Sequence, residues 1–317
     1  MKKKIYLAGH KGLAGSAILK ELRNNKNYKV YYKTRKELNL FNYSDVLKYF
    51  KKEKFNDVYL AAAKSGGIMA NIKYPLDFIE ENLIIQNNLI KAAFQTNVEK
   101  FLFLGSSCIY PKNFNRKIKE TDFLSDKLEE SNQYYAIAKI AGVKLCEAYN
   151  KQYNFKTKYI PVMPCNLFGK NDKFNLENAH VVAALLKKIH DAKKNNLKKI
   201  VVFGDGTPRR EFLDSGELAR ACIFLMKMDF NKIKKIFNKR HHIINVGYGS
   251  DMSIKQLINY YCKILDYKGK IIFDKTKPNG TMRKLMDSST IHRLGWKPKN
   301  NIYSSLKTYV QDYKKNN

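Results

Sequence analysis

Two short motifs place four reactive side chains in the first half of the chain. Ser106 and Cys108 lie in the motif GSSCIY, and Tyr135 and Lys139 lie in the motif YAIAK. A Tyr and a Lys four residues apart share one face of a helix, and a serine at the end of an apolar strand can point toward the same place. Around one carbonyl, this set could donate a proton to the oxygen during reduction and remove a proton from a neighbouring carbon.

The segments around these motifs alternate between strands and helices. Strands are predicted at 4–8, 30–33, 57–62 and 100–105, and helices at 16–24, 43–54, 78–96 and 134–149. Such alternation is typical of a parallel sheet covered by helices on both faces. We therefore expect an α/β fold with a doubly wound parallel sheet of the Rossmann type and a smaller, interleaved C-terminal substrate domain.

The expected domain division follows from a late strand at 245–247 that would rejoin the first sheet. Residues 1–167, rejoined by about 214–250, are assigned to the dinucleotide-binding domain. Residues 168–213 and 251–317 are assigned to the substrate domain, with a strand at 271–273 and helices at the C-terminal end.

The turn after the first strand carries the pattern Gly9-x-x-Gly12-x-x-Gly15. Glycines at this place allow a tight turn and a close approach of the backbone to a pyrophosphate, and the helix N-terminus favours an anion. The second predicted strand is followed by no acid until Glu37, whereas Arg35 and Lys11 could pair with a 2′-phosphate. This favours NADP(H) as the cofactor, although both cations could instead be part of a solvated lysine-rich surface.

Composition excludes several classes of protein. The chain has 317 residues of which 44% are hydrophobic, enough for a sizeable core. It contains neither a long apolar run nor a signal peptide, so we expect a cytoplasmic protein that does not enter a membrane. The five cysteines are scattered without C-x-x-C pairs, which argues against structural disulfides and against a metal site.

The formal net charge of +32 could indicate a nucleic-acid or membrane partner. Lysines are spread over nearly every predicted element, and they outnumber the arginines that base readout favours. We interpret the charge mainly as a solvated basic surface, part of which a nucleotide-linked substrate would use, and expect no nucleic-acid partner.

Taken in order, the motifs resemble those of the GDP-L-fucose synthases in the extended short-chain dehydrogenase/reductase family. The similar blocks are GHKG at 9–12, AAAK at 61–64, GSSCIYP at 105–111, YAIAK at 135–139, NLFG at 166–169 and GDGTP at 204–208. The resemblance implies an NADPH-dependent enzyme that epimerises C3 and C5 of GDP-4-keto-6-deoxy-D-mannose and then reduces C4 to give GDP-L-fucose. It also implies a homodimer formed through the two long helices.

The resemblance assigns roles to individual residues. Tyr135, Lys139 and Ser106 would serve the reduction, Cys108 would be the epimerisation base and His180 its acid. The expected cofactor-binding residues are Gly9, His10, Lys11, Gly12, Leu13, Gly15, Arg35, Ala62, Ala63, Tyr135, Lys139, Pro164, Asn166, Leu167 and His180. The expected substrate-binding residues are Lys188, Phe203, Arg210 and Lys284, with Val182 also near the pocket.

Three positions depart from the family's pattern. Asp214 stands where the family commonly has a histidine, Lys188 replaces an arginine and Phe203 replaces a tryptophan. These changes concern the sugar more than the nucleotide. One alternative is therefore a C4 reductase, with or without epimerase activity, that acts on a related GDP-4-keto-6-deoxy-heptose. A remote alternative is a non-catalytic protein that binds NADPH or nucleic acid.

Overall fold

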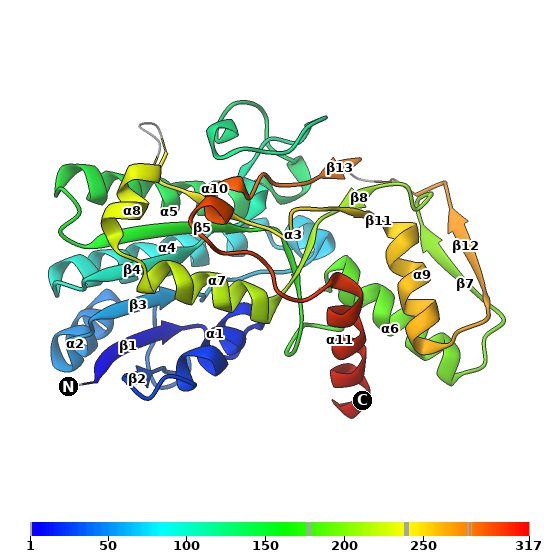
Figure 1. Ribbon diagram of the computed structural model, residues 1–317, viewed down its shortest axis with the longest axis horizontal. Coiled ribbons are helices and arrows are strands. Elements are labelled where there is room, and N and C mark those ends of the chain that lie inside the picture. Colours follow the sequence, from blue (N-terminus) through cyan, green and yellow to red (C-terminus); the bar gives the residue numbers. More distant parts are fainter. Residues whose placement is uncertain (1, 176–178, 238–240, 278, 280, 317) are drawn as a thin grey trace.

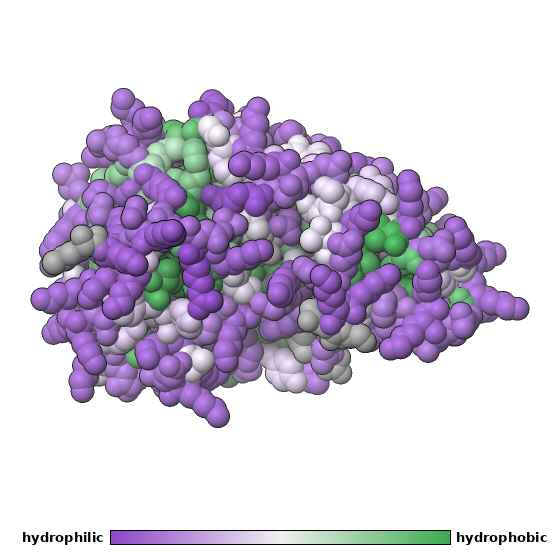
Figure 2. Space-filling model, turned by 60° about the horizontal axis from the view of Figure 1, so that its bottom comes forward, coloured by the Kyte–Doolittle hydropathy of each residue, from purple (hydrophilic) through white to green (hydrophobic). Residues whose placement is uncertain are grey.

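The computed structural model describes residues 2–175, 179–237, 241–277, 279 and 281–316. The molecule is elongated: a larger part built around one sheet carries a smaller part at one end (Figure 1). Hydrophilic side chains cover most of the face seen in Figure 2. Among the described residues, no helix has both the length and the apolar character needed to cross a bilayer.

The larger part contains a six-stranded sheet with the order β10-β5-β4-β3-β1-β2. Its strands are β1 Lys3–Ala8, β2 Tyr28–Tyr31, β3 Asp57–Leu60, β4 Lys100–Leu104, β5 Lys158–Pro164 and β10 Ile244–Val246. All neighbouring pairs are parallel, and every residue of β3 and β4 is buried, as expected for strands covered on both faces. The predicted doubly wound sheet is confirmed, including the late strand that rejoins it.

Two groups of helices cover the faces of this sheet (Figure 1). α1 (Leu13–Arg23) packs against α7 (Ser215–Lys227), while α4 (Pro75–Gln95) packs against both α2 (Tyr43–Glu53) and α5 (Gln133–Gln152). α4 begins three residues earlier than predicted because Pro75 occupies its first turn, where a missing N–H costs nothing. The short helices α3 (Ile68–Lys73) and α8 (Phe230–Ile236) complete this part.

The smaller part is built from helices and short strands. The helices are α6 Val181–Lys194, α9 Ile254–Leu265 and α11 Ile302–Asn316, and β7 Lys199–Phe203 pairs in parallel with β12 Lys270–Asp274. Three further short pairings connect β6 Asn166–Phe168 with β9 Phe212–Asp214, and β8 Arg209–Arg210 with both β11 Met252–Ser253 and β13 Arg283–Lys284. Between β4 and α5 the chain also forms three single turns of 3-10 helix, η1 Ser107–Ile109, η2 Glu120–Asp122 and η3 Glu130–Asn132.

Two clusters of buried apolar side chains correspond to the two parts. The larger cluster surrounds the six-stranded sheet, and the smaller one lies among α6, α9, α11 and β7. Met286, Ile291 and Trp296 belong to the larger cluster, although the sequence-based division places all of 251–317 in the substrate domain. The chain thus returns to the sheet-bearing part around α10 (Ser289–Arg293) before α11 enters the smaller part.

Candidate active site

The buried strand β4 ends in a turn that carries Ser106 and Cys108. Ser106 caps η1, and its Oγ accepts a hydrogen bond from the Cys108 backbone N–H at 3.2 Å. The Asn132 side-chain amide donates to Cys108 Sγ at 3.5 Å. The hydroxyl and the thiol are therefore held on one rigid turn at the carboxyl end of a central strand.

Helix α5 brings Tyr135 and Lys139 to the same turn. Lys139 is only 3% exposed, and its Nζ donates to the Leu104 carbonyl at the end of β4, at 2.9 Å. The same ammonium lies 5.8 Å from the centroid of the Tyr135 ring. Burial lowers the pKa of Lys139 to about 8.

The phenol of Tyr135 faces the turn that carries Ser106 and Cys108. Burial raises the pKa of Tyr135, Cys108 adds to this effect, and a hydrogen bond with Ser106 opposes it. A high pKa keeps the phenol protonated at neutral pH, as a proton donor requires. The structure thus gathers Ser106, Cys108, Tyr135 and Lys139 as the two sequence motifs predict.

His180 lies on the other side of the junction between the two parts of the molecule. It precedes α6 as the N-cap residue and is exposed, and its carbonyl accepts the first helical hydrogen bond from Ala184 at 2.9 Å. Although the residue is exposed to solvent, many protein atoms surround its imidazole, and the resulting desolvation, together with the nearby charge of Lys173, lowers the pKa of the ring. None of the described contacts joins His180 to Cys108 or Tyr135, so its predicted role stays a prediction.

The glycine turn between β1 and α1 has no room for a side chain at Gly9 or Gly15. Gly9 has φ of +88°, and a Cβ there would lie 2.6 Å from the Ala62 backbone nitrogen. A Cβ on Gly15 would lie 2.0 Å from the Gly9 oxygen. Gly12 begins α1 without a side-chain cap, so the N–H groups of the first turn are available to an anion.

His10 adds an unused polar atom to this turn. Its ring packs on Tyr32 with the centroids 4.6 Å apart, and its Nδ1 is buried without a hydrogen-bond partner in the described part of the chain. A tight turn with free helical N–H groups and an unpaired buried nitrogen fits a dinucleotide diphosphate.

The residues expected to select the cofactor's ribose lie after β2. Arg35 is exposed and stacks over the Phe41 ring at 4.7 Å, and Lys11 is exposed in the glycine turn. The Glu37 carboxylate accepts hydrogen bonds from the Thr34 N–H at 2.8 Å and from its hydroxyl at 2.7 Å, which lowers the pKa of Glu37 to about 2. The Glu37 carboxylate thus already has hydrogen-bond partners within its own turn.

The remaining predicted cofactor residues lie at the carboxyl ends of the parallel strands, where open α/β sheets bind ligands. Ala62 and Ala63 follow β3, Pro164 ends β5, and Leu13 begins α1. Asn166 and Leu167 form β6, and the Asn166 amide donates to the Glu211 carbonyl at 3.1 Å.

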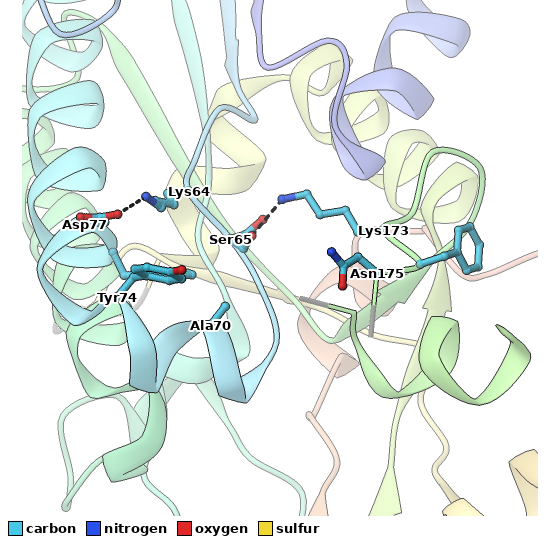
Figure 3. Close-up of a pocket in the computed structure, with 9 residues that line it drawn as sticks. Lys64, Ser65, Ala70, Tyr74, Asp77, Lys173 and Asn175 are labelled. Carbon is cyan, nitrogen blue, oxygen red and sulfur yellow. Dashed lines mark hydrogen bonds and ion pairs between the residues drawn. The ribbon is translucent and has the colours of Figure 1, made fainter. Parts of the chain in front are cut away.

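A cavity of about 520 Å³ lies between the two parts of the molecule, beside these strand ends. Lys64 and Ser65 line it from the loop after β3, and Lys173 lines it from the loop before α6 (Figure 3). Lys64 forms ion pairs with Asp77 and Glu81 across one wall.

Two contacts place this cavity relative to the site. The Phe78 ring lines the cavity and packs edge-on against Tyr135 with the centroids 6.1 Å apart. Lys173 Nζ donates to the Ser65 carbonyl at 3.2 Å and so bridges the two parts (Figure 3). The Phe78 ring therefore lies between the cavity and Tyr135.

Comparison with known proteins gives the site its context. Residues 5–247 match the family described as "NAD dependent epimerase/dehydratase family". The chain belongs to this family.

Several members of the epimerase/dehydratase family are similar along the whole chain. A GDP-L-fucose synthase of Escherichia coli (strain K12) is 44% identical over 315 residues, which are 99% of this chain and 98% of that protein. A GDP-L-colitose synthase of Yersinia pseudotuberculosis is 37% identical, with 99% of each chain covered.

Among solved structures, a GDP-mannoheptose C4 reductase from Campylobacter jejuni with NADP bound is 38% identical. It superposes with a TM-score of 0.88 over 99% of this chain and 98% of that one. A GDP-6-OMe-4-keto-L-xylo-heptose reductase from the same organism is 36% identical, with a TM-score of 0.91 over 100% and 99%.

Within this epimerase/dehydratase framework, the predicted substrate residues form two groups. Arg210 in β8 lies directly opposite Lys284 in the parallel strand β13, so the strand register brings the two cations together. Phe203 is 67% exposed at the end of β7, and Lys188 Nζ lies 5.8 Å from its ring centroid.

Sequence reasoning missed two neighbours of these groups. Lys277 Nζ also lies over the Phe203 ring, at 6.0 Å. Glu129 raises the pKa of Arg210, although burial has the larger effect and lowers it. Neither residue lies in a recognisable motif, and only folding brings each to its partner.

Two residues near the substrate loop have local roles in the structure. Val182 is fully buried in the smaller apolar cluster, and its carbonyl accepts from Tyr261 Oη at 3.1 Å, so its side chain does not line an open pocket. Asp214, the acid in place of the family's histidine, caps α7 by accepting from the Gly216 N–H at 2.8 Å. The acid thus acts locally, as a helix cap.

Proposed function

We propose that the chain is an NADPH-dependent epimerase/reductase that converts GDP-4-keto-6-deoxy-D-mannose to GDP-L-fucose. The observation that carries this proposal is the position of Cys108 on the turn of Ser106, beside Tyr135. A plain reductase has no need for a thiol at this place. The whole-length similarity to proteins named GDP-L-fucose synthase, at 44–46% identity, supports the same reaction.

We propose NADP(H) as the cofactor, held by the glycine turn, with Lys11 and Arg35 for the 2′-phosphate. When bound, the cofactor supplies the hydride for C4. Lys139 would also hold its ribose, because the ammonium is fixed beside Tyr135.

The epimerisation would use Cys108 and His180 on opposite sides of the sugar. A ketone at C4 acidifies the protons on C3 and C5, so Cys108 as thiolate can remove one and leave an enolate. His180, as imidazolium, would then return a proton to the opposite face, and the centre inverts. Proton exchange with solvent would restore the thiolate and the imidazolium before the second centre reacts. Ser106 and Tyr135 would stabilise the enolate oxygen with their hydrogen bonds.

The reduction would use the same oxygen site. As C4 is reduced, Tyr135 gives its proton to the developing alkoxide. Lys139 stabilises the phenolate that remains, while Ser106 orients the carbonyl.

The nucleotide end would occupy the junction of the two parts. Arg210 and Lys284 form a pair of fixed cations that suits a diphosphate. Phe203 offers an exposed aromatic face for the nucleotide's base, and Lys188 lies beside this ring.

A second candidate function is C4 reduction of a related GDP-4-keto-heptose. The heptose reductase structures at 36% and 38% identity, which superpose over nearly the whole chain, favour it. Such an enzyme would use Ser106, Tyr135 and Lys139 in the same way and would leave Cys108 and His180 without an essential role.

The deciding experiment separates the two steps. NADPH oxidation is measured with GDP-4-keto-6-deoxymannose and with its heptose analogue, and deuterium uptake from solvent at C3 and C5 is measured without NADPH. We expect turnover of the hexose and exchange at both carbons, with exchange lost in Cys108→Ser. Exchange that survives this substitution would remove the thiol from the mechanism, and turnover of neither sugar would refute the reductase.

We also propose a homodimer formed through α4 and α5. These helices pack against each other and leave Tyr134 and Ile137 exposed on α5, at 43% and 41%. Light scattering should give twice the chain mass, and Ile137→Glu should shift it toward the monomer. An unchanged dimer would place the interface elsewhere.

A further inference from the structure

A second cavity, of about 460 Å³, lies apart from all the residues assigned above. Its charged and polar lining includes one carboxylate, Asp287, together with Lys117, Ser250, Ser288, Ser289, His292 and Lys297. They come from the loop before η2, the connection between β10 and β11, and the segment around α10, which Figure 1 shows near the top of the molecule. None of them belongs to the proposed catalytic, cofactor or substrate set.

Two polar atoms at this cavity are buried and unused. Ser288 is only 3% exposed, and its Oγ has no hydrogen-bond partner in the described part of the chain. It precedes α10 but does not cap it with its side chain. His292 Nε2 is likewise buried and unpaired. A buried polar group without a hydrogen-bond partner is unfavourable, so both atoms favour a ligand that can accept or donate hydrogen bonds.

The charge around the cavity is positive. Lys117 and Lys297 are exposed at its edge, and Lys117 Nζ contacts the Gly249 carbonyl at 3.5 Å. Desolvation lowers the pKa of His292, and the charges of Lys297 and Lys117 lower it further, which places both ammonium groups near this ring.

The single carboxylate of the lining does not cancel this charge. Asp287 accepts a hydrogen bond from the Ser289 N–H at 2.9 Å. Burial opposes ionisation of Asp287, but the Ser289 hydrogen bonds, Lys117 and Lys119 together lower its pKa. Two lysines therefore face one carboxylate that is already bonded.

We propose that this cavity binds a phosphate group, either as inorganic phosphate or as the phosphomonoester of a small metabolite. Ammonium groups and serine hydroxyls are donors that match the several acceptor oxygens of a phosphate. By rotation of its side chain toward the cavity that the residue lines, Ser288 Oγ would gain the partner that it lacks in the protein alone. Because the chain runs from Lys284 through Asp287 to Ser289, a bound phosphate would also tie the segment after β13 to the loop that carries Lys117.

The test uses the full chain saturated with NADP⁺ and GDP, so that the proposed active site cannot supply the binding. Inorganic phosphate and ribose 5-phosphate are titrated separately by calorimetry. The test variant is a double substitution, Lys117→Gln together with Lys297→Gln. The control variant carries both Lys127→Gln and Lys299→Gln, at two exposed lysines outside the cavity lining, one after η2 and one after α10. Their loss changes the net charge equally.

We expect saturable binding of at least one ligand, weakened at least tenfold in the Lys117/Lys297 variant and unchanged in the control. Ser288→Ala removes one hydroxyl from the cavity and should weaken binding about threefold to tenfold. The proposal is overturned if neither ligand binds to the loaded protein, or if the two lysine pairs behave alike. Both results are independent of whether the enzyme turns over a GDP-sugar.

Discussion

Tyr135 and Lys139 show how one buried ammonium can control a proton donor. The helix α5 fixes Lys139 on the carbonyl of Leu104, so its charge lies beside the phenol without a carboxylate to neutralise it. The phenol keeps its proton until an acceptor oxygen develops charge. Both residues have properties set by burial, which the motif itself does not encode.

Replacement of Tyr135 by phenylalanine should lower both the reduction and the C3/C5 exchange by about 10²- to 10⁴-fold, since one hydroxyl serves both steps. Tyr134→Phe is the matched control, because Tyr134 is the preceding residue and is 43% exposed. Steady-state NADPH oxidation and deuterium uptake measure the two steps. An unaffected exchange in Tyr135→Phe would mean that the enolate is stabilised elsewhere.

The pKa of about 8 for Lys139 predicts the alkaline limb of the pH profile. Below this pH the ammonium is charged and can stabilise the phenolate, so kcat/KM for reduction should fall tenfold per pH unit above about 8. Lys139→Met should lower kcat/KM at neutral pH and remove this limb. A profile of the unsubstituted enzyme that stays flat to pH 10 would contradict the assignment.

At the scale of elements, turns and loops place the site's parts around the ends of parallel strands. The glycine turn depends on close packing between β1 and α1. The loop before α6 is anchored by the half-buried Asp172, which accepts from Tyr309 Oη at 3.0 Å. The same loop reaches across the junction with Lys173. The two loops face the cofactor and substrate sides of the site.

Gly15→Ala should destabilise the chain by about 1–3 kcal/mol, because its Cβ would lie 2.0 Å from the Gly9 oxygen and the turn must move. Gly12→Ala is the control, since the nearest atom to its Cβ would be 3.5 Å away. Urea unfolding without cofactor measures both variants. Equal stability of the two would show that the turn has more room than the structure indicates.

Lys173→Met should raise KM for the GDP-sugar a few-fold with little change in kcat, because one hydrogen bond across the junction, worth about 0.5–1.5 kcal/mol, is lost. Lys173→Arg should restore most of the affinity. Lys170→Met, an exposed lysine of the same loop, is the control. If the Lys170 and Lys173 variants have the same KM, the bridge to Ser65 has no role in binding.

At the scale of the whole molecule, one carboxyl group holds distant segments together. Glu211 is completely buried, and it accepts from the Gly249 N–H at 2.7 Å and from the Met286 N–H at 3.0 Å. It thereby joins β8 and β9 to the segments after β10 and β13, where the chain passes between the two parts. Burial raises the pKa of Glu211 to about 7.

This raised pKa predicts a pH-dependent stability. The folded state favours the protonated form of the Glu211 carboxyl more strongly than the unfolded state does. The contribution of this carboxyl to the free energy of unfolding is therefore complete below about pH 4.5 and is lost as the pH rises through about 7. Between these limits the free energy of unfolding should fall by about 2–3 kcal/mol more in the unsubstituted protein than in Glu211→Gln, which cannot titrate. Urea titrations at pH 5 and pH 7.5 measure the difference. Parallel changes in the two proteins would exclude Glu211 as the cause.

Local patterns determined the sheet and the chemistry of the site. Apolar runs and the glycine turn set the strands β1, β3 and β4 near their observed bounds, and the motifs GSSCIY and YAIAK named four residues that the fold gathers. These signals are readable because each depends on neighbours within a few residues. Helix starts were less accurate where a turn residue, such as Pro75, extended the helix.

Tertiary structure alone decided what depends on burial and on contacts distant in sequence. The pKa of Lys139 and the pKa of Glu211 follow from surrounding atoms that no local pattern specifies. The return of Met286 to the sheet-bearing core and the register of Arg210 with Lys284 likewise join residues far apart in the chain. A sequence records which groups exist, whereas desolvation and distance, which set what those groups do, arise only when the chain is packed.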